Sequence, residues 1–399
     1  MAIDTPVKWY TSSMAGIPEW GATNDNTAPG KLVPVLDAVM VDGFGLVTID
    51  NLSVANNVAT ATRSAGMPFF PDQVIAVAGA SPAALNGEWR VVAVTGSTLT
   101  FTTSGISNQT ATGTITIKTA PLGWELVFSD TNRRVYRSKS DKSPRSFYRF
   151  NDQTSGTVYT TPLGAFTSMS SIDSGTGQWY TEVPSTSQYG IARSYEDLTY
   201  TIVGDDRTVH IHNRYRHLYS TLFDIQSFGD FFSFAPVDSE NEVVACGAGY
   251  NQSSPAYVYN LLNATTYSPT GYAQYQRRIR RGTNGVFGAR VYGGTYVGQV
   301  LSGESGIVFP NGVGNSLILA ETLIREEDNG SHVRGKMRGM YNILNSLPLP
   351  LQTAMQVVSG VTGLENRKVG VFRLYANKSC TSQTFVSGQA AIDITGPWD

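Results

Sequence analysis

The sequence is poor in cysteine, in charged residues and in long apolar runs, and each shortage excludes a class of protein. Its two cysteines, Cys246 and Cys380, lie far apart and match neither a metal-ligand spacing nor a disulfide framework. A large chain without disulfides is typical of a protein made in a reducing cytosol. No apolar run approaches the roughly 18 residues of a membrane span. The first residues lack the basic and apolar regions of a signal peptide. We therefore predict neither a membrane span nor a secretory signal.

Charged residues make up only 15% of the 399 residues, against about 25% in ordinary soluble proteins. The net charge is −2, so we expect no global attraction to nucleic acid or to an anionic membrane. A surface short of charge must be covered by Thr, Ser, Asn, Gly and Tyr, which suits a protein packed against neighbours. An ordinary β protein rich in Thr and Ser explains the composition equally well.

Residues 39–119 carry the clearest secondary-structure pattern, an alternation of apolar and polar residues between turn residues. Leu99 and Phe101 share one face of a predicted strand, with threonines on the other, and Ile115 and Ile117 repeat this arrangement. Turn residues recur about every 8–12 residues, as they do in all-β sandwiches and barrels. The pattern predicts a small antiparallel β module, Ig-like or barrel-like, and nothing in it indicates catalysis.

Residues 1–38 precede this module and have the composition of an extended N-terminal arm. Between Met14 and Lys31, glycine, proline and asparagine are too frequent for regular structure. Three large aromatic rings lie in this arm: Trp9, Tyr10 and Trp20. These rings either pack into the chain's own core or dock the arm on a neighbouring subunit, where aromatic anchors dominate binding energy. The sequence does not choose between the two.

Residues 120–399 predict one large β-sandwich-like domain with long loops. Its predicted strands cover 126–128, 133–137, 146–150, 198–203, 207–213, 229–236, 242–246, 286–292, 316–324, 369–375 and 390–395. Pro162 breaks a passage rich in Gly, Ser and Thr, and 204–206 is a hairpin turn signal. Helical periodicity is nearly absent, with room for a turn or two at 341–347 and 351–359. No short-period repeat indicates a propeller or β-helix. The fold class predicted for the whole chain is all-β.

Enzymatic interpretations find little support in the sequence. Residues 172–176 match the active-loop pattern of aspartic proteases around Asp173, but such catalysis needs a second carboxylate sharing one proton, and no second pattern occurs. Glycan cleavage would need two carboxylates facing across a groove. The available ones lie in turn-like runs, where solvation is the default: Asp205, Asp206, Glu326, Glu327 and Asp328. We predict no catalytic residue.

A metal site is the other chemical alternative. His210 and His212 lie on one face of a predicted strand, so two imidazoles could reach a metal ion. The neighbouring Arg207, Arg214 and Arg216 would repel a cation, and an exposed polar strand face is the better interpretation. We predict no metal site and no cofactor.

Two clusters favour interaction with other molecules. The first is a dense basic run that follows a series of tyrosines: Tyr272, Tyr275, Arg277, Arg278, Arg280 and Arg281. Aromatics beside arginines bind single-stranded nucleic acid, stack on sugars, or form protein interfaces. The near-zero net charge disfavours nucleic acid, and we favour pairing with a neighbour's acidic loop such as 326–328; a solvated run is an equal alternative. The second cluster alternates around two glycines and could bridge subunits similarly: Arg334, Lys336 and Arg338.

Several stretches, in order along nearly the whole chain, resemble recurring landmarks of tailed-bacteriophage virion structural proteins. They are 41–45, 58–62, 85–87, 111–114, 123–124, 132–137, 229–230, 332–341, 347–350 and 393–398. The resemblance implies a component of the virus particle and does not say which position it takes. The passages 162–184 and 250–275 match no landmark, and this chain's own contacts could lie there.

These observations predict a non-enzymatic structural component of a tailed-phage virion, assembled in the cytoplasm of a bacterial host. We place it on the tail side, in the tail, baseplate or fibre attachment, as a homo-oligomer that contacts its own copies and other virion proteins. Two alternatives remain open. One is a capsid-decorating or head-fibre protein, and the other is a receptor protein whose 250–275 loops bind a host-surface glycan.

Overall fold

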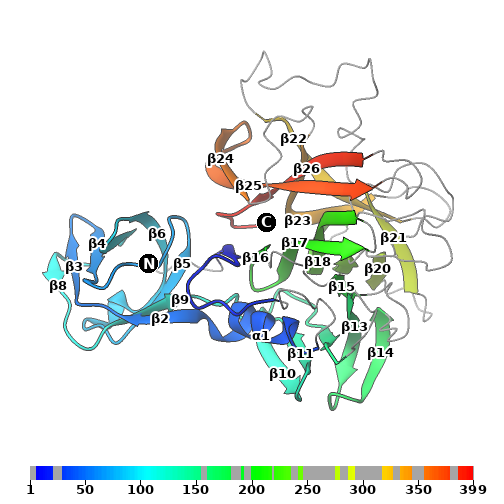
Figure 1. Ribbon diagram of the computed structural model, residues 1–399, viewed down its shortest axis with the longest axis horizontal. Helices are drawn as coiled ribbons and strands as arrows, with labels where there is room; N and C mark the ends of the chain where they lie inside the picture. The colour runs from blue at the N-terminus through cyan, green and yellow to red at the C-terminus, as the bar shows by residue number, and fades with distance from the viewer. Residues whose placement is uncertain are drawn as a thin grey trace.

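The computed structural model is built almost entirely of antiparallel β-strands, arranged as a small module beside a larger body (Figure 1). It describes residues 6–20, 29–153, 160–180, 190–192, 199–217, 220–234, 241–245, 275–278, 286–292, 317–326, 333–343, 355–377 and 385–398. The predicted all-β fold class is confirmed. Among the described residues, no helix has the length and apolar character needed to cross a membrane.

The module is an eight-stranded sheet that curls around a core of its own. Its strand order is β2-β9-β5-β6-β7-β4-β3-β8. The strands are β2 (Phe44–Thr48), β3 (Asn51–Ala55), β4 (Val58–Thr62), β5 (Val74–Ala78), β6 (Gly87–Val94), β7 (Thr98–Thr102), β8 (Gln109–Thr110) and β9 (Thr116–Thr119), with a 3-10 turn η2 (Ala83–Leu85) after β5. Leu99, Phe101, Ile115 and Ile117 all point into this core, as the alternation predicted. Trp89 stacks on Phe101 with ring centroids 5.1 Å apart.

The body consists of two sheets that face each other across an aromatic core. The larger has twelve strands: β1 (Lys8–Thr11), β16 (Tyr200–Gly204), β17 (Thr208–His217), β18 (Ser220–Ser233), β19 (Glu242–Ala245), β20 (Tyr275–Arg278), β21 (Val286–Tyr292), β22 (Leu319–Glu326), β23 (Val333–Ile343), β24 (Gln356–Val361), β25 (Leu364–Asn377) and β26 (Phe385–Asp393). Because β18 also pairs with β23 and β25, this sheet curls back on itself.

The smaller sheet of the body has six strands. They are β10 (Glu125–Ser129), β11 (Arg133–Arg137), β12 (Phe147–Asn151), β13 (Thr160–Met169), β14 (Gly175–Tyr180) and β15 (Gly190–Ala192). Phe228 of the large sheet contacts Trp124 and Tyr148, with ring centroids 5.7 and 5.4 Å apart. Edge and tilted contacts of this kind are the favourable geometries for aromatic pairs, so the two layers form the predicted sandwich-like arrangement.

The N-terminal segment belongs to the body. Strand β1 pairs with β16, and the segment before the module forms a helix, α1 (Leu32–Leu36), continued by the π-helical turn η1 (Asp37–Asp42). Pro34 is tolerated because the first helical turn has no use for its missing N–H. The Leu32 N–H donates to Asp152 Oδ2 at 2.8 Å. The predicted extended arm therefore contains a short helix, whose apolar residues are buried.

Two other expectations are corrected. The turns of helix expected near 341–347 and 351–359 are absent from the described residues there, which form the end of β23 and strand β24 instead. Pro162 does not interrupt the structure, because it lies within β13 opposite Gly190. It marks the position where β13 ends its pairing with β15 and begins to pair with β12. A proline fits a strand best where the ladder of hydrogen bonds is already interrupted.

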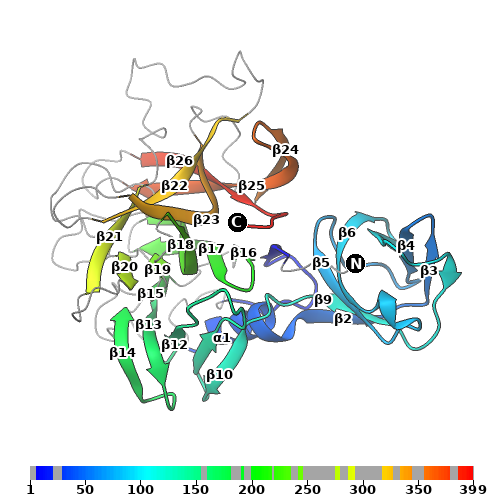
Figure 2. The ribbon, with the colours of Figure 1, turned by 180° about the vertical axis from the view of Figure 1, so that it is seen from behind.

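The module is inserted between the N-terminal segment and the rest of the body (Figures 1 and 2). The chain enters it at Phe44 and leaves it at Thr119, and these two residues face each other in register. The junction with the body combines polar contacts with the ring contact of Trp9 and Phe70, whose centroids are 6.3 Å apart. The Arg90 guanidinium donates to the carbonyls of Val7 and Thr395 at 2.9 and 3.0 Å. Because Val7 and Thr395 lie near opposite ends of the chain, Arg90 ties both end segments to the module.

Candidate functional site

The aromatic rings of the predicted arm lie in the chain's own core. Trp9, Tyr10 and Trp20 are 8%, 0% and 1% exposed. The Tyr10 hydroxyl donates to the Ala120 carbonyl at 2.7 Å, and Trp20 packs edge-on against Tyr200 with centroids 5.5 Å apart. The structure thus takes the first of the two alternatives. To anchor the arm on a neighbouring subunit, these rings would have to leave this core.

The basic run after the tyrosines lies only partly within the described residues. Tyr275, Arg277 and Arg278 belong to β20, which pairs with β19 and β21. Tyr272, Arg280 and Arg281 lie outside the described residues, as do Glu327 and Asp328 of the suggested acidic partner loop. The contacts predicted for this cluster remain a prediction.

The second basic cluster lies on β23, and its members have different surroundings. Arg334 belongs to this strand. Lys336 Nζ lies 2.5 Å from Glu321 Oε1 of the same chain. Arg338 is only 5% exposed, so the prediction that its side chain bridges subunits is wrong. The register between β22 and β23 shifts between Lys336 and Tyr341. Such a bulge re-aims side chains, and here it accompanies an arginine that lies inside the fold.

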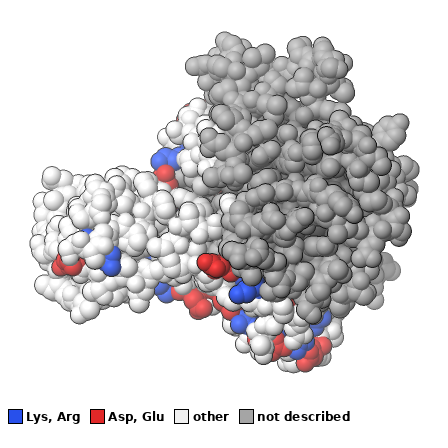
Figure 3. Space-filling model, viewed as in Figure 1, with Lys and Arg blue, Asp and Glu red and all other residues white. Residues whose placement is uncertain are grey.

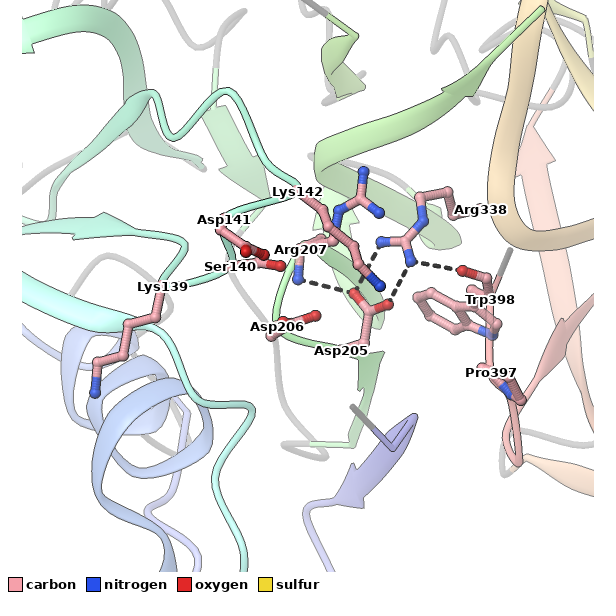
Figure 4. Close-up of a pocket in the computed structure, with 10 residues that line it drawn as sticks. All are labelled: Lys139, Ser140, Asp141, Lys142, Asp205, Asp206, Arg207, Arg338, Pro397 and Trp398. Atoms are coloured by element: carbon pink, nitrogen blue, oxygen red, sulfur yellow. Dashed lines mark hydrogen bonds and ion pairs between the residues drawn. The ribbon is translucent and has the colours of Figure 1, made fainter. Parts of the chain in front are cut away.

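Arg338 lines a pocket at which four parts of the body meet. The pocket has a volume of about 340 Å³. It is bordered by the β11–β12 loop, the β16–β17 turn, β23 and the C-terminal segment (Figure 4). Its lining residues are Lys139, Ser140, Asp141, Lys142, Asp205, Asp206, Arg207, Arg338, Pro397 and Trp398.

Asp205 is the central anion of this site. It accepts from the backbone N–H groups of Arg207 and Thr208 at 2.9 and 2.8 Å, which closes the predicted hairpin turn. Its other oxygen lies 2.8 Å from Arg338 Nη2. Asp205 and Arg338 are both nearly inaccessible to solvent. A carboxylate held by two backbone donors and a guanidinium stabilises the hairpin turn.

Arg338 extends the network to the C-terminal segment. It donates to the Trp398 carbonyl at 2.6 Å and to Thr208 Oγ1 at 3.1 Å. The Trp398 indole N–H donates to the Asp393 carbonyl at 3.0 Å. The indole also lies against the His210 ring, with centroids 5.1 Å apart. The C-terminal segment is thus fastened over β17 and β23.

A second buried ion pair lies beside the first. Arg207 Nε is 2.7 Å from Asp230 Oδ2, and the Ser143 hydroxyl donates to the other oxygen of Asp230 at 2.9 Å. Burial raises the pKa of Asp230 to about 6, although the positive charge of Arg207 acts to lower this pKa. Burial, followed by the nearby charge of Asp205, also raises the pKa of Asp206 on the pocket wall. The buried charges hold the β11–β12 loop and the hairpin turn together.

The two histidines considered as metal ligands are buried, so the expectation of an exposed polar strand face is wrong. His210 Nε2 lies 2.7 Å from the Arg338 carbonyl, which can only accept, so Nε2 carries the proton. Nδ1 then accepts from the Ser227 hydroxyl at 2.7 Å. His212 packs against Phe372 with ring centroids 5.1 Å apart. His210 therefore has no lone pair available for a cation. Within the described segments, no group of three or more metal-ligating side chains is found.

The buried His210 predicts an acid-sensitive fold. Burial lowers its pKa to about 4, whereas an unfolded chain takes up this proton near pH 6.5. Between pH 6.5 and 4 the unfolded state binds more protons, so His210 should lower the free energy of unfolding by up to about 3 kcal/mol as the pH falls. Urea unfolding across this range should show a smaller acid-induced loss in His210→Gln than in the unmodified chain.

Asp230 supplies a control of opposite sign for this experiment. Its raised pKa means that the native state keeps a proton up to about pH 6, while the unfolded chain loses it near pH 4. Asp230 therefore favours the native state at low pH, and Asp230→Asn should steepen the acid-induced loss. If both variants changed the profile in the same direction, the assignment would be contradicted.

The surroundings of Asp173 differ from the paired carboxyl groups that an aspartic protease needs. Its side chain is 71% exposed at the turn between β13 and β14, where it pairs with Arg133 at 2.5 Å. Proton sharing requires a second carboxyl group beside it, and its close charged partner is instead a cation. The pattern at 172–176 covers the end of a surface turn and the first two residues of β14.

Two parts of the pocket escaped the sequence analysis. Lys139, Asp141 and Lys142 form a short run of charge in a chain with little charge, and this contrast was the available signal. Trp398 lies in the landmark 393–398, but its packing on His210 joins residues that are 188 positions apart, and no local sequence pattern predicts such a contact.

Comparison with known proteins adds little. No protein-family model matches the chain, and no curated protein matches it. Among solved structures, the phage phi92 endosialidase is similar over 88% of this chain, with 11% sequence identity and a TM-score of 0.17. The match covers 52% of that protein, so this chain spans about half of its length. A TM-score this low does not establish a shared fold.

Proposed function

We propose that this protein is a non-enzymatic structural component of a tailed-phage virion, attached on the tail side and acting through contacts between subunits. The observation that carries the non-enzymatic part of the proposal is the internal pairing of its buried charges. Asp205 binds Arg338, Asp230 binds Arg207, and both nitrogens of His210 have protein partners. Groups of the kind that enzymes expose to substrate brace this fold instead.

The distribution of charge over the module supports attachment to other proteins. Asp72, Glu88 and Arg90 face the body, where they pair with Lys368, Lys8 and backbone carbonyls. On the face shown in Figure 3, the rest of the module has few charged side chains. Depletion of charge is typical of the centres of protein interfaces, so the module is well suited to be covered in an assembly.

The assignment to a virion is supported by the sequence resemblance to tailed-phage virion proteins, which leaves the position in the particle open, and the tail side is our proposal among those positions. In this proposal the chain assembles as a homo-oligomer with other virion proteins around it. The contacts come from sheet surfaces rather than from a substrate cleft, and no cofactor takes part. The charged pocket then fastens the C-terminal segment to the body.

The proposal is tested by locating the chain in particles. Fab fragments raised against the purified protein should label the tail in electron micrographs of the source phage. Labelling of the head would favour capsid decoration and contradict the tail assignment, and absence of the chain from purified particles would contradict a virion role. Asp206→Asn and Asp173→Asn each remove one carboxylate considered in the two enzymatic interpretations. Both variants should be incorporated like the unmodified chain, and failure of a folded variant would count against a purely structural role.

A further inference from the structure

The pocket beside Arg338 contains one carboxyl group that the buried ion pairs leave out. Asp205 pairs with Arg338, and Asp230 pairs with Arg207. Asp206 follows Asp205 in the hairpin turn and lies half-buried in the pocket wall (Figure 4). Within the described part of the chain, no lysine or arginine forms an ion pair with Asp206, and its Oδ1 atom is buried without a hydrogen-bond partner. Asp206 is thus an acceptor that its own neighbours leave short of a donor.

The surroundings of Asp206 disfavour a negative charge that has no partner. Burial, followed by the negative charge of Asp205, raises the pKa of Asp206, although Ser140 and two nearby arginines act to lower this pKa. Taking a carboxylate out of water costs free energy unless an opposite charge or a hydrogen-bond donor offsets the loss of hydration. A cation bound at the accessible side of this carboxyl group would supply that compensation.

The walls of the pocket are held in place by the fold itself. The Ser138 hydroxyl donates to the Asp206 carbonyl at 2.7 Å, and the Ser143 hydroxyl donates to Asp230 at 2.9 Å. These two bonds tie the β11–β12 loop to the hairpin turn and to β18 on either side of the loop's exposed tip. Pro397 and Trp398 add an apolar part to the lining. A preformed pocket of about 340 Å³ lies at the small end of the range for ligand sites, roughly 300–1,000 Å³, and suits a small molecule.

We propose that this pocket binds a small protonated alkylamine, whose ammonium group donates to the Asp206 carboxylate while its alkyl chain lies against Pro397 and Trp398. A primary ammonium group carries three donors and no acceptor, which complements a carboxylate short of donors. A metal ion is a poorer occupant because it needs several protein ligands. Among the described residues, no group of three or more metal-ligating side chains is found.

The rim of the pocket favours a free amine over a lysine side chain of a neighbouring protein. Lys139, Asp141 and Lys142 are exposed on this rim, and charged side chains are depleted at the centres of protein interfaces. Figure 4 shows Lys139 pointing away from the pocket and Lys142 reaching across it toward Asp205. Lys142 is therefore an internal cation with which a bound amine must compete.

The test titrates the full chain with n-butylammonium at constant ionic strength and follows the indole N–H signal of Trp398 by NMR. We expect a saturable shift with a Kd in the millimolar range, because the probe has only a few non-hydrogen atoms. Asp206→Asn keeps the shape of the side chain but removes its charge, and should weaken binding about tenfold or more. Lys142→Gln removes the competing cation and should strengthen binding, a gain that a misfolded variant cannot give. Asp173→Asn removes a carboxylate outside the pocket and should change nothing.

Two matched probes show whether the positive charge is what the pocket recognises. n-Butanol and butyrate have the same alkyl chain without an ammonium group, and neither should shift the Trp398 signal. The inference is overturned if n-butylammonium does not saturate, if Asp206→Asn binds it equally well, if Lys142→Gln binds it more weakly, or if butyrate binds instead. Tighter binding of a capped tripeptide with a central lysine would identify a neighbouring protein as the occupant and overturn the assignment to a free amine. Amine binding is independent of a virion role, so its failure would leave the proposed function standing.

Discussion

Replacing Arg338 with methionine should lower the free energy of unfolding by about 3–5 kcal/mol, the usual cost of leaving one member of a buried ion pair alone. The Asp205 carboxyl group, at 2% exposure, would then keep its two backbone N–H donors but lose its guanidinium partner. The Trp398 carbonyl would lose its donor at the same time. Chemical denaturation of the purified chain measures the loss directly.

Two further variants separate the buried pair from a general effect of substitution on β23. Lys336→Met lies on the same strand but removes a partly exposed pair with Glu321, and such pairs contribute at most about 1 kcal/mol. The double variant Arg338→Met with Asp205→Asn removes both buried charges while position 205 can still accept from the turn. It should recover at least half of the stability. Equal losses at Arg338 and Lys336, or no recovery in the double variant, would contradict the importance of the pair.

The sequence predicted the module better than the body because the module has one buried face for each strand. Leu99, Phe101 and Ile117 alternate with threonines, and a period of two residues is the signal that a half-buried strand leaves. In the body, β17 is buried through His210 and His212 as well as through its apolar residues. Polar side chains that are satisfied inside the fold look like a solvent face in sequence, so the burial of this strand could not be predicted.

The pocket was hidden for a related reason. The predicted hairpin turn located Asp205 correctly, but its partner Arg338 lies 133 positions away along the chain. In sequence, Arg338 and Lys336 alternate around Gly335 and Gly339, and alternate residues of a regular strand share a face. The register shift in β23 removes that regularity. Asp205 and Arg338 are far apart in sequence, and a register shift changes the faces of β23. No local sequence pattern therefore predicts the pocket.

The helix α1 shows the same limit on a smaller scale. Its sequence, Leu-Val-Pro-Val-Leu, is apolar throughout and β-branched in part, which favours neither a helix nor a strand clearly. The N–H of Leu32 finds its acceptor on Asp152, 120 residues away. Burial of the apolar side chains against the body and this distant acceptor stabilise the helix. Tertiary contacts therefore override local preference here.

Gly339 should be the least replaceable glycine of the C-terminal fastening. It adopts φ +67°, and a Cβ at this position would lie 2.1 Å from Trp398 Cε2. Two hydrogen bonds hold Trp398 in place. Its indole N–H donates to the Asp393 carbonyl, and its own backbone carbonyl accepts from Arg338. Gly339→Ala should therefore lower the free energy of unfolding by about 2–5 kcal/mol, as the sum of the left-handed backbone cost and overpacking.

Gly363 provides a matched control for the backbone cost alone. It also has a positive φ, +84°, but an added Cβ would have no atom within 4 Å. Gly363→Ala should cost only about 1–2 kcal/mol, so the difference between the two variants measures the packing of Trp398 on β23. Trp398→Ala in the Gly339→Ala background should add less destabilisation than it does alone, because the clash would already have displaced the indole. Equal costs at the two glycines in denaturant unfolding would mean that the C-terminal segment is not fastened to β23 in solution.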